Sequence, residues 1–198
     1  MPFDHNDHYH GLLLRNLPPR GRTALDVGCG TGRFARLLAA RGYEVDALDP
    51  SAEVIAEAEA TGGGPRFRQA DVTAEQLPGG HYDAITCLAS LHHMPFDTVT
   101  RLRDALAPGG TLLVLGCYAG MTWWDPVASP VNAVARVTVY ARERLRGEHT
   151  PPLKAPVHQP DMRLPGIRTE AARLLPGSSV RQLLFWRYLL TYRRPLGN

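Results

Sequence analysis

Short apolar runs alternate with segments of helical periodicity along residues 23–117. Apolar and β-branched residues predict five strands, over residues 23–27, 43–48, 66–69, 82–87 and 111–115. Apolar positions three and four residues apart predict helices over residues 33–41, after Ser51, and after Asp97 or Thr98. Residues 73–77, between the third and fourth strands, are too few to predict a helix. The alternation indicates an α/β fold, with a parallel sheet covered by helices on both faces.

The pattern changes after residue 117. Residues 118–165 are rich in proline and aromatic side chains, and within them a helix over residues 129–147 is predicted to begin at a Ser-Pro pair and to end at a glycine. A proline-rich loop follows as far as residue 165. A short helix is then predicted over residues 168–175. Residues 180–192 are dense in apolar, aromatic and β-branched side chains and predict two more strands.

The composition is that of an ordinary globular protein. The 198 residues include 22 Lys and Arg and 19 Asp and Glu, for a net charge of +3. This length fits a single domain over residues 1–198 and is short for two. The basic residues are scattered, which argues against a nucleic-acid partner. No apolar run approaches the ~20 residues of a membrane helix, and the polar first ten residues show no secretory signal.

Cysteine and histidine usage argues against a metal site. Cys29, Cys87 and Cys117 are widely spaced and form no CxxC pair, so we expect reduced thiols in a cytoplasmic protein. The Asp- and His-rich residues 4–10 resemble a metal cluster, but a polar terminus is the commoner meaning of such a stretch. We therefore expect no bound metal.

Residues 25–32 carry the most informative chemistry. A buried strand ends in Asp26, and a turn with Gly28, Gly30 and Gly32 leads into a helix. Glycines let the backbone approach a ligand closely, and a helix N-terminus attracts anionic groups. A dinucleotide motif requires G-x-G-x-x-G, but its third position here is Arg33, and no P-loop G-K-[ST] follows. Asp26 would repel a pyrophosphate and suits a cofactor that carries a positive charge and an ammonium group.

Five elements in chain order resemble the class I S-adenosylmethionine-dependent methyltransferases. They are the Asp26 glycine turn, Asp49 after the second strand, Asp71 after the third, the fourth strand at residues 82–88, and the L-x-P-G-G-x-L pattern at residues 106–112. The resemblance extends from about residue 25 to residue 114. It implies a doubly wound, Rossmann-like sheet of seven mostly parallel strands, in which residues 180–192 supply the last two strands, one of them antiparallel.

The resemblance implies S-adenosylmethionine as the cofactor. In the family, the acid at Asp49 binds the ribose hydroxyls and the acid at Asp71 meets the adenine amino group. The segment before the first strand often folds over the cofactor, so Tyr9 or His8 is expected to touch it. The cofactor site implied in this way comprises Tyr9, Asp26, Gly28, Cys29, Gly30, Gly32, Asp49, Pro50, Asp71, Val72 and Leu88.

The same resemblance implies transfer of a methyl group to an oxygen, nitrogen or carbon atom of a small molecule, in secondary metabolism. Residues 118–165 depart from the shared pattern and are expected to form a helical, proline-rich cap over the substrate. Trp123 and Trp124 could either stack on a flat substrate or pack the cap onto the sheet. His92 and His93 follow the fourth strand, and either could act as a general base near neutral pH. An acceptor that needs no deprotonation would make a base unnecessary.

Two other classes of function remain open from the sequence. One is an enzyme that uses the same cofactor for intramolecular cyclisation with release of methylthioadenosine. The other is a non-catalytic cofactor-binding protein, which the intact set of Asp26, Asp49 and Asp71 argues against. The region after the fourth strand lacks the N/D-P-P-Y/F tetrad, so nucleic-acid or protein substrates are not expected. We expect a small-molecule substrate, no membrane partner, and a monomer or homodimer.

Overall fold

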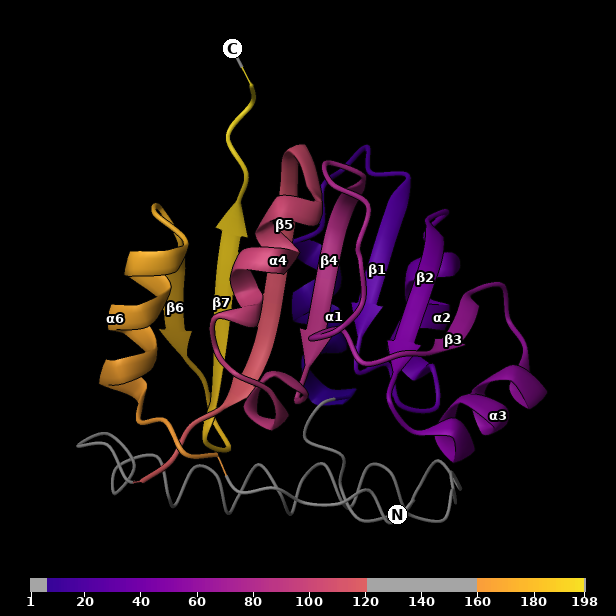
Figure 1. Cartoon of the computed structure of the whole chain (residues 1–198), viewed down its shortest axis with the longest axis horizontal. Coiled ribbons are helices and arrows are strands. Elements are labelled where there is room, and N and C mark those ends of the chain that lie inside the picture. Colours follow the sequence, from indigo (N-terminus) through magenta and orange to yellow (C-terminus); the bar gives the residue numbers. More distant parts are fainter. Residues whose placement is uncertain (1–6, 121–159, 198) are drawn as a thin grey trace.

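A twisted seven-stranded sheet forms the centre of the protein (Figure 1). The computed structural model describes residues 7–120 and 160–197. The strands lie in the order β3-β2-β1-β4-β5-β7-β6. Their bounds are β1 Thr23–Val27, β2 Glu44–Asp49, β3 Arg66–Gln69, β4 Tyr82–Leu88, β5 Leu106–Cys117, β6 Ser179–Gln182 and β7 Arg187–Arg193. Strand β7 is antiparallel to both of its neighbours, and the pairs among β1 to β5 are parallel. The seven-stranded, mostly parallel sheet predicted from the sequence is confirmed.

Helices cover both faces of this sheet. Helices α4 (Thr98–Ala105) and α6 (Leu164–Leu174) lie on the front face in Figure 1, while α1 (Asp7–Arg15) and α2 (Arg33–Ala39) lie behind it. The side chains of β5 alternate between two hydrophobic clusters, with Leu112 packed among α4 and α6 and Leu113 among α1 and α2. Because both faces of the sheet centre are buried, the central strands β1, β4 and β5 contain nearly continuous buried runs.

The chain reverses its winding direction between β1 and β4, and this places a crevice at the carboxyl edge of the sheet. From β1 the chain passes through α2 to β2, and through α3 (Ala52–Thr61) to β3. It then returns across the sheet to β4 on the other side of β1. Helix α3 begins where the Ser51 hydroxyl accepts a hydrogen bond from the Val54 N–H at 3.4 Å. In open α/β sheets such a switch point is the usual ligand site.

Two elements begin several residues earlier than the sequence predicts, and one helix was not predicted. Helix α6 begins at Leu164, although a loop was expected to residue 165, because proline is tolerated in the first helical turn, where its missing N–H is not needed. Strand β5 begins at Leu106, although a break was expected at residues 108–110, because the Gly109 N–H and Gly110 carbonyl bond to Arg194 at 3.0 and 2.9 Å. Helix α1 was not predicted. The absence of a helix between β3 and β4 is confirmed.

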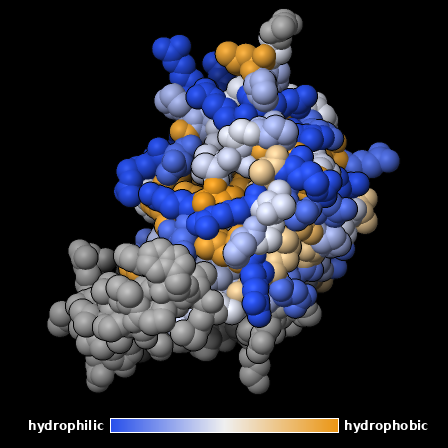
Figure 2. All heavy atoms as spheres, turned by 90° about the vertical axis from the view of Figure 1, so that its left-hand side faces the viewer, coloured by the Kyte–Doolittle hydropathy of each residue, from blue (hydrophilic) through white to orange (hydrophobic). Residues whose placement is uncertain are grey.

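Most of the expected cap, residues 118–165, lies outside the described residues. This holds for the predicted helix at residues 129–147, for Trp123 and Trp124, and for the first residues of the Asp- and His-rich terminus. Seen from the α6 and β6 side in Figure 2, the described surface is mostly hydrophilic, with a smaller hydrophobic area near its centre. Within residues 7–120 and 160–197, no helix is long and apolar enough to cross a membrane.

Candidate active site

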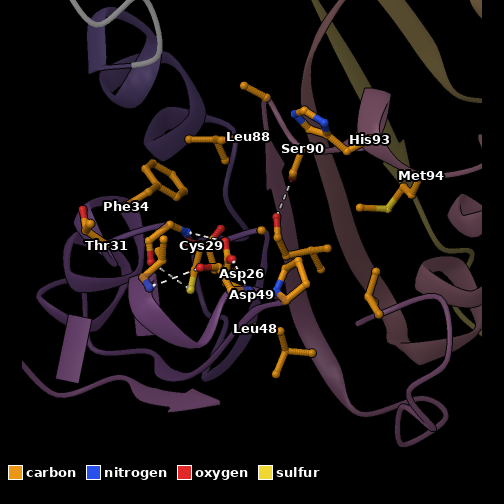
Figure 3. Close-up of a pocket in the computed structure, with 18 of the residues that line it drawn as sticks. Asp26, Cys29, Thr31, Phe34, Leu48, Asp49, Leu88, Ser90, His93 and Met94 are labelled. Carbon is orange, nitrogen blue, oxygen red and sulfur yellow. Dashed lines mark hydrogen bonds between the residues drawn. The ribbon is translucent and has the colours of Figure 1, made fainter. Parts of the chain in front are cut away.

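A cavity of about 1050 Å³ opens at the carboxyl ends of β1, β2 and β4. The glycine turn after β1 forms one wall, and the residues after β2, β3 and β4 form the others. Figure 3 shows Asp26 and Asp49 side by side in the middle of the site, with Phe34 and Leu88 on one side and His93 and Met94 on another. Nine of the predicted cofactor residues line this cavity: Asp26, Gly28, Cys29, Gly30, Asp49, Pro50, Asp71, Val72 and Leu88.

The glycine turn is held against two neighbouring strands. The Gly28 and Cys29 N–H groups both donate to the Leu48 carbonyl, at 2.8 and 3.0 Å. Gly28 has a φ of 67°, and a Cβ built on it would lie 2.3 Å from the Cβ of Ser90. Gly30 has a φ of 54°, but a Cβ there would meet nothing within 4 Å. Gly28 is therefore required by packing inside the protein, whereas Gly30 leaves open space beside the cavity.

Ser90 was missed by sequence reasoning, although it supports the glycine turn. Its hydroxyl donates to the Val27 carbonyl at 2.7 Å and lies 3.0 Å from the Cys87 sulfur. This links the loop after β4 to the end of β1 across 63 residues of sequence. Nothing in a serine that follows an apolar strand predicts such a contact, because the pairing of β1 with β4 is decided by the tertiary structure.

Asp49 connects the ends of β1 and β2. One carboxylate oxygen, Oδ2, accepts the Gly30 N–H at 3.0 Å, and the other, Oδ1, accepts the Ser51 N–H at 3.0 Å. The carboxylate is thereby fixed in the wall of the cavity. Each oxygen has two lone pairs, so capacity remains for hydroxyl donors of a ligand.

Asp26 is a buried acid with a strongly altered pKa. Its side chain is only 2% exposed, and Oδ1 accepts a hydrogen bond from the Thr86 hydroxyl at 2.7 Å. Burial, together with the nearby Asp49 carboxylate, raises the pKa of Asp26 to about 7, although the hydrogen bond from Thr86 acts in the opposite direction. A cationic ligand group beside Asp26 would favour its charged form.

Asp26→Asn is expected to flatten the pH dependence of protein stability between about pH 4 and pH 7. The native pKa lies above the ordinary value of 3.8, so the folded protein keeps a proton that the unfolded chain releases over this interval. Stability therefore falls as the pH rises, at up to about 1.4 kcal/mol per pH unit from this group alone. Asparagine can still accept from Thr86 but does not titrate. Urea unfolding of both proteins across this range measures the effect, and equal slopes would contradict it.

Asp71, which follows β3, also lines the cavity and is exposed. Its Oδ1 accepts two hydrogen bonds from Thr73, one from the N–H at 2.9 Å and one from the hydroxyl at 2.7 Å. These hydrogen bonds lower the pKa of Asp71, which keeps the carboxylate charged and able to accept. Val72 beside it is buried and contributes an apolar wall.

Two predicted cofactor residues, Tyr9 and Gly32, do not line the cavity. Tyr9 lies on the sheet side of α1, where its hydroxyl donates to the Leu184 carbonyl at 3.0 Å. Asp7 and His10, three residues apart on another face of the helix, line the cavity instead. Gly32 has a φ of 79° and lies so close to Phe67 that a Cβ would be 2.4 Å from the ring. It serves the packing of α2 against β3.

The two histidines after β4 differ in their relation to the cavity. Both belong to η1 (Leu91–His93), a single 3₁₀ turn. His93 lines the cavity, whereas His92 does not. Their rings lie 4.1 Å apart between centroids. Of the two candidate general bases, only His93 therefore lies where it could contact a ligand in the cavity.

The cysteines near the cavity have the properties of packed side chains. Burial raises the pKa of the Cys29 thiol far above its ordinary value, and raises that of Cys87 to about 12. Protonated thiols of this kind are poor nucleophiles. In the part of the chain that the structure describes, no group of three or more His, Cys, Asp or Glu side chains could hold a metal ion.

Comparisons with known proteins identify the family to which the chain is similar. Residues 24–110 match the family described as "Methyltransferase domain". The chain is 36% identical to an uncharacterized methyltransferase of Mycobacterium tuberculosis (strain H37Rv), over 99% of both proteins. It is also 32% identical to the trans-aconitate 2-methyltransferase of M. tuberculosis (strain H37Ra). That alignment of 145 residues covers 69% of this chain and 52% of the other protein.

A solved structure shares the fold. The S-adenosylmethionine-dependent methyltransferase of Mesorhizobium loti superposes with a TM-score of 0.66 at 19% identity, over 93% of this chain and 96% of that one. Three findings indicate the same family: the matching family domain, a relative aligned over nearly its full length, and the strand order of the sheet. The chain belongs to the class I S-adenosylmethionine-dependent methyltransferases.

Proposed function

We propose that the protein transfers the methyl group of S-adenosylmethionine, bound in the cavity described above, to a small-molecule acceptor. The observation that carries this proposal is the convergence of Asp26, Asp49 and Asp71, from the ends of three different strands, on the wall of one cavity. We take residues 1–198 to form one domain that works in the cytoplasm as a monomer or homodimer. Residues 118–165 would then supply the acceptor side.

The residues present fit the cofactor. The carboxyl of Asp26 lies beside the glycine turn, and its acidic character suits the ammonium group of the methionine part. Asp49, fixed by the N–H groups of Gly30 and Ser51, is suited to accept from two ribose hydroxyls. Asp71 is held charged by Thr73 and is suited to accept from the adenine amino group. The open space beside Gly30 leaves room for a ligand against the backbone.

The chain's contribution to the reaction is mainly positional. When bound, the cofactor supplies an electrophilic methyl group on its sulfonium sulfur. Leu88, Met94 and Phe34 line the cavity with apolar surface that excludes water. Holding an acceptor in line for attack converts a bimolecular step into one within a complex, which contributes about 7–11 kcal/mol in favourable cases.

A small-molecule acceptor is supported by two observations. Acidic side chains neutralise individual arginines, as Asp7 does for Arg33 and Asp46 for Arg66. One relative, similar over 69% of this chain, is named a trans-aconitate 2-methyltransferase. A place in secondary metabolism remains part of the proposal.

His93→Gln and His92→Gln are each expected to change kcat by less than about threefold, because positioning alone is sufficient for many methyl transfers. Glutamine keeps roughly the size and hydrogen bonding of histidine but does not titrate near neutral pH. Steady-state kinetics of both single variants and of the double variant test this. A loss of about 10²–10⁴ in kcat, confined to His93→Gln, would instead identify His93 as a general base. The rate would then rise through a pKa near ~6.5.

Calorimetric titration of the purified protein with S-adenosylmethionine, S-adenosylhomocysteine and NAD tests the proposed cofactor. We expect saturable binding of the first two and none of NAD. Saturable binding of NAD alone would overturn the proposal. Product analysis by mass spectrometry then separates methyl transfer from cyclisation, since the first releases S-adenosylhomocysteine and the second releases methylthioadenosine.

A further inference from the structure

Arg187 starts strand β7 at the same carboxyl edge of the sheet as the cavity. It is the register partner of Cys117, the last residue of β5. Opposed residues of an antiparallel pair share a face, and the electrostatic effect of the Arg187 guanidinium on the Cys117 thiol agrees with this. The face is the one covered by α1, because Leu189 and Leu115, each two residues away, pack in the α1 cluster. With one strand between them, β7 and β4 lie about 10 Å apart.

The charge of Arg187 is not balanced by the described part of the protein. Its Nε is buried and has no hydrogen-bond partner there, and Arg187 forms no ion pair with a carboxylate among residues 7–120 and 160–197. The titratable groups beside it are neutral. Burial raises the pKa of the Cys117 thiol, and it raises that of Tyr9 to about 12. A buried guanidinium donor without an acceptor is unfavourable unless a ligand supplies one.

The turn that leads into Arg187 is strained. The Arg187 N–H donates to the Leu184 carbonyl at 3.3 Å, and the two residues between, Phe185 and Trp186, have φ values of 60° and 54°. Two successive positive φ values define a type I′ turn, which favours Asn and Gly over aromatic residues. The turn connects β6 and β7, and its two aromatic residues are held in a backbone conformation that they rarely adopt.

Surrounding contacts hold this turn in place. The ring of Phe185 is 2% exposed and packs in the α1 cluster, and the Tyr9 hydroxyl donates to the Leu184 carbonyl. Trp186 is 43% exposed at the same edge. The turn therefore sets a rigid starting point for the Arg187 side chain, and it leaves a large aromatic surface beside it for a ligand.

We propose that Arg187 binds an oxyanion of the acceptor substrate, so that the protein methylates a small carboxylic or phosphoric acid. This inference rests on the proposed function and names the substrate class for the same site. The planar fork of a guanidinium matches two oxygens of a carboxylate or a phosphate, and charge-assisted bonds of this type fix orientation as well as affinity. An acid anchored at β7 would extend toward the cavity across the end of β5.

The test compares acids with their neutral methyl esters on protein saturated with S-adenosylhomocysteine. The probes are trans-aconitate, citrate, benzoate and phenyl phosphate, each paired with its ester, and binding is followed by calorimetry. We expect at least one acid to bind tenfold or more tightly than its ester. Arg187→Gln should weaken that acid tenfold or more and leave the ester unchanged. Carboxylates and the phosphate in the same panel distinguish the two kinds of oxyanion.

Arg181→Gln is the matched control. Arg181 is an exposed arginine on the same hairpin and also acts electrostatically on Tyr9, so a general charge effect would affect both variants equally. Arg187→Lys keeps the positive charge but lacks the planar guanidinium, so the acid should bind with intermediate affinity. This variant also tests the inference if Arg187→Gln is too unstable to measure. Acids and esters that bind alike or not at all, or equal effects of the two glutamine variants, would overturn the inference. Failure of the wild type to bind S-adenosylmethionine would instead overturn the proposed function.

Discussion

Gly28→Ala is expected to abolish measurable cofactor binding and to lower the free energy of unfolding by about 2–5 kcal/mol. Two costs add. The φ of 67° disfavours any residue with a Cβ, and the new Cβ would lie 2.3 Å from the Cβ of Ser90. Because Ser90 is itself fixed by its hydrogen bond to Val27, the glycine turn has to move toward the cavity. Urea unfolding and calorimetric titration with S-adenosylmethionine measure the two effects.

Gly30→Ala provides the control for this prediction. Its φ of 54° carries a similar backbone penalty, but the new Cβ would meet nothing within 4 Å. We expect a loss of about 1–2 kcal/mol in unfolding free energy and no clash within the protein. Adding Ser90→Gly to Gly28→Ala should recover part of the lost stability, since it removes the clashing atoms. Equal destabilisation by the two alanine variants, with no recovery in the double variant, would mean that Ser90 does not restrict the turn.

Asp49→Ala is expected to weaken S-adenosylmethionine binding about 10²–10⁴-fold. The carboxylate accepts the Gly30 and Ser51 N–H groups and is suited to accept two ribose hydroxyls as well. Each charge-assisted hydrogen bond contributes about 1.5–3 kcal/mol, and loss of the bond to Gly30 also removes one of the contacts between the glycine turn and β2. Dissociation constants from calorimetry at one pH and ionic strength give the effect directly.

Asp71→Ala should raise the dissociation constant by only about tenfold to a hundredfold, because that acid is exposed and is suited to a single bond with the adenine amino group. Asp46→Ala is the control variant, for which we expect no effect on cofactor binding. Asp46 lies on the same strand as Asp49, but it accepts from Arg66 and Tyr82, and it is not a cavity residue. We expect its dissociation constant to stay within about twofold of the wild-type value, with any loss confined to stability. A larger effect for Asp71 than for Asp49 would show that the ribose and adenine assignments are wrong.

Much of the architecture could be predicted because its signals are local. Buried parallel strands require continuous apolar runs, and the helices between them require a period of 3.6 residues, so β1, β2, β4 and the centre of β5 were located correctly. The glycine turn was equally clear, because positive φ values at Gly28 and Gly30 exclude most other residues. Asp49 and Asp71 follow strands directly, and the carboxyl ends of parallel strands meet at one edge of a sheet.

What failed or was missed depends on contacts between distant segments. The face of α1 that meets the sheet determines that Asp7 and His10, and not Tyr9, line the cavity. The contact of Ser90 with Gly28 arises only when β4 pairs with β1. The extension of β5 through Gly109 and Gly110 arises from pairing with Arg194 near the other end of the chain.

The sequence by itself determined the order of elements, the glycine turn and the three acids, because each depends on the residue types within one short segment. The tertiary structure decided which of these side chains share a cavity and which are buried in packing. It alone brought Arg187, Cys117 and Tyr9 together, from segments separated by 70 residues or more, into a cationic site without a carboxylate partner in the described chain. The physical reason is that burial and charge balance depend on all the neighbours of a group, and strand pairing chooses those neighbours only when the whole sheet forms.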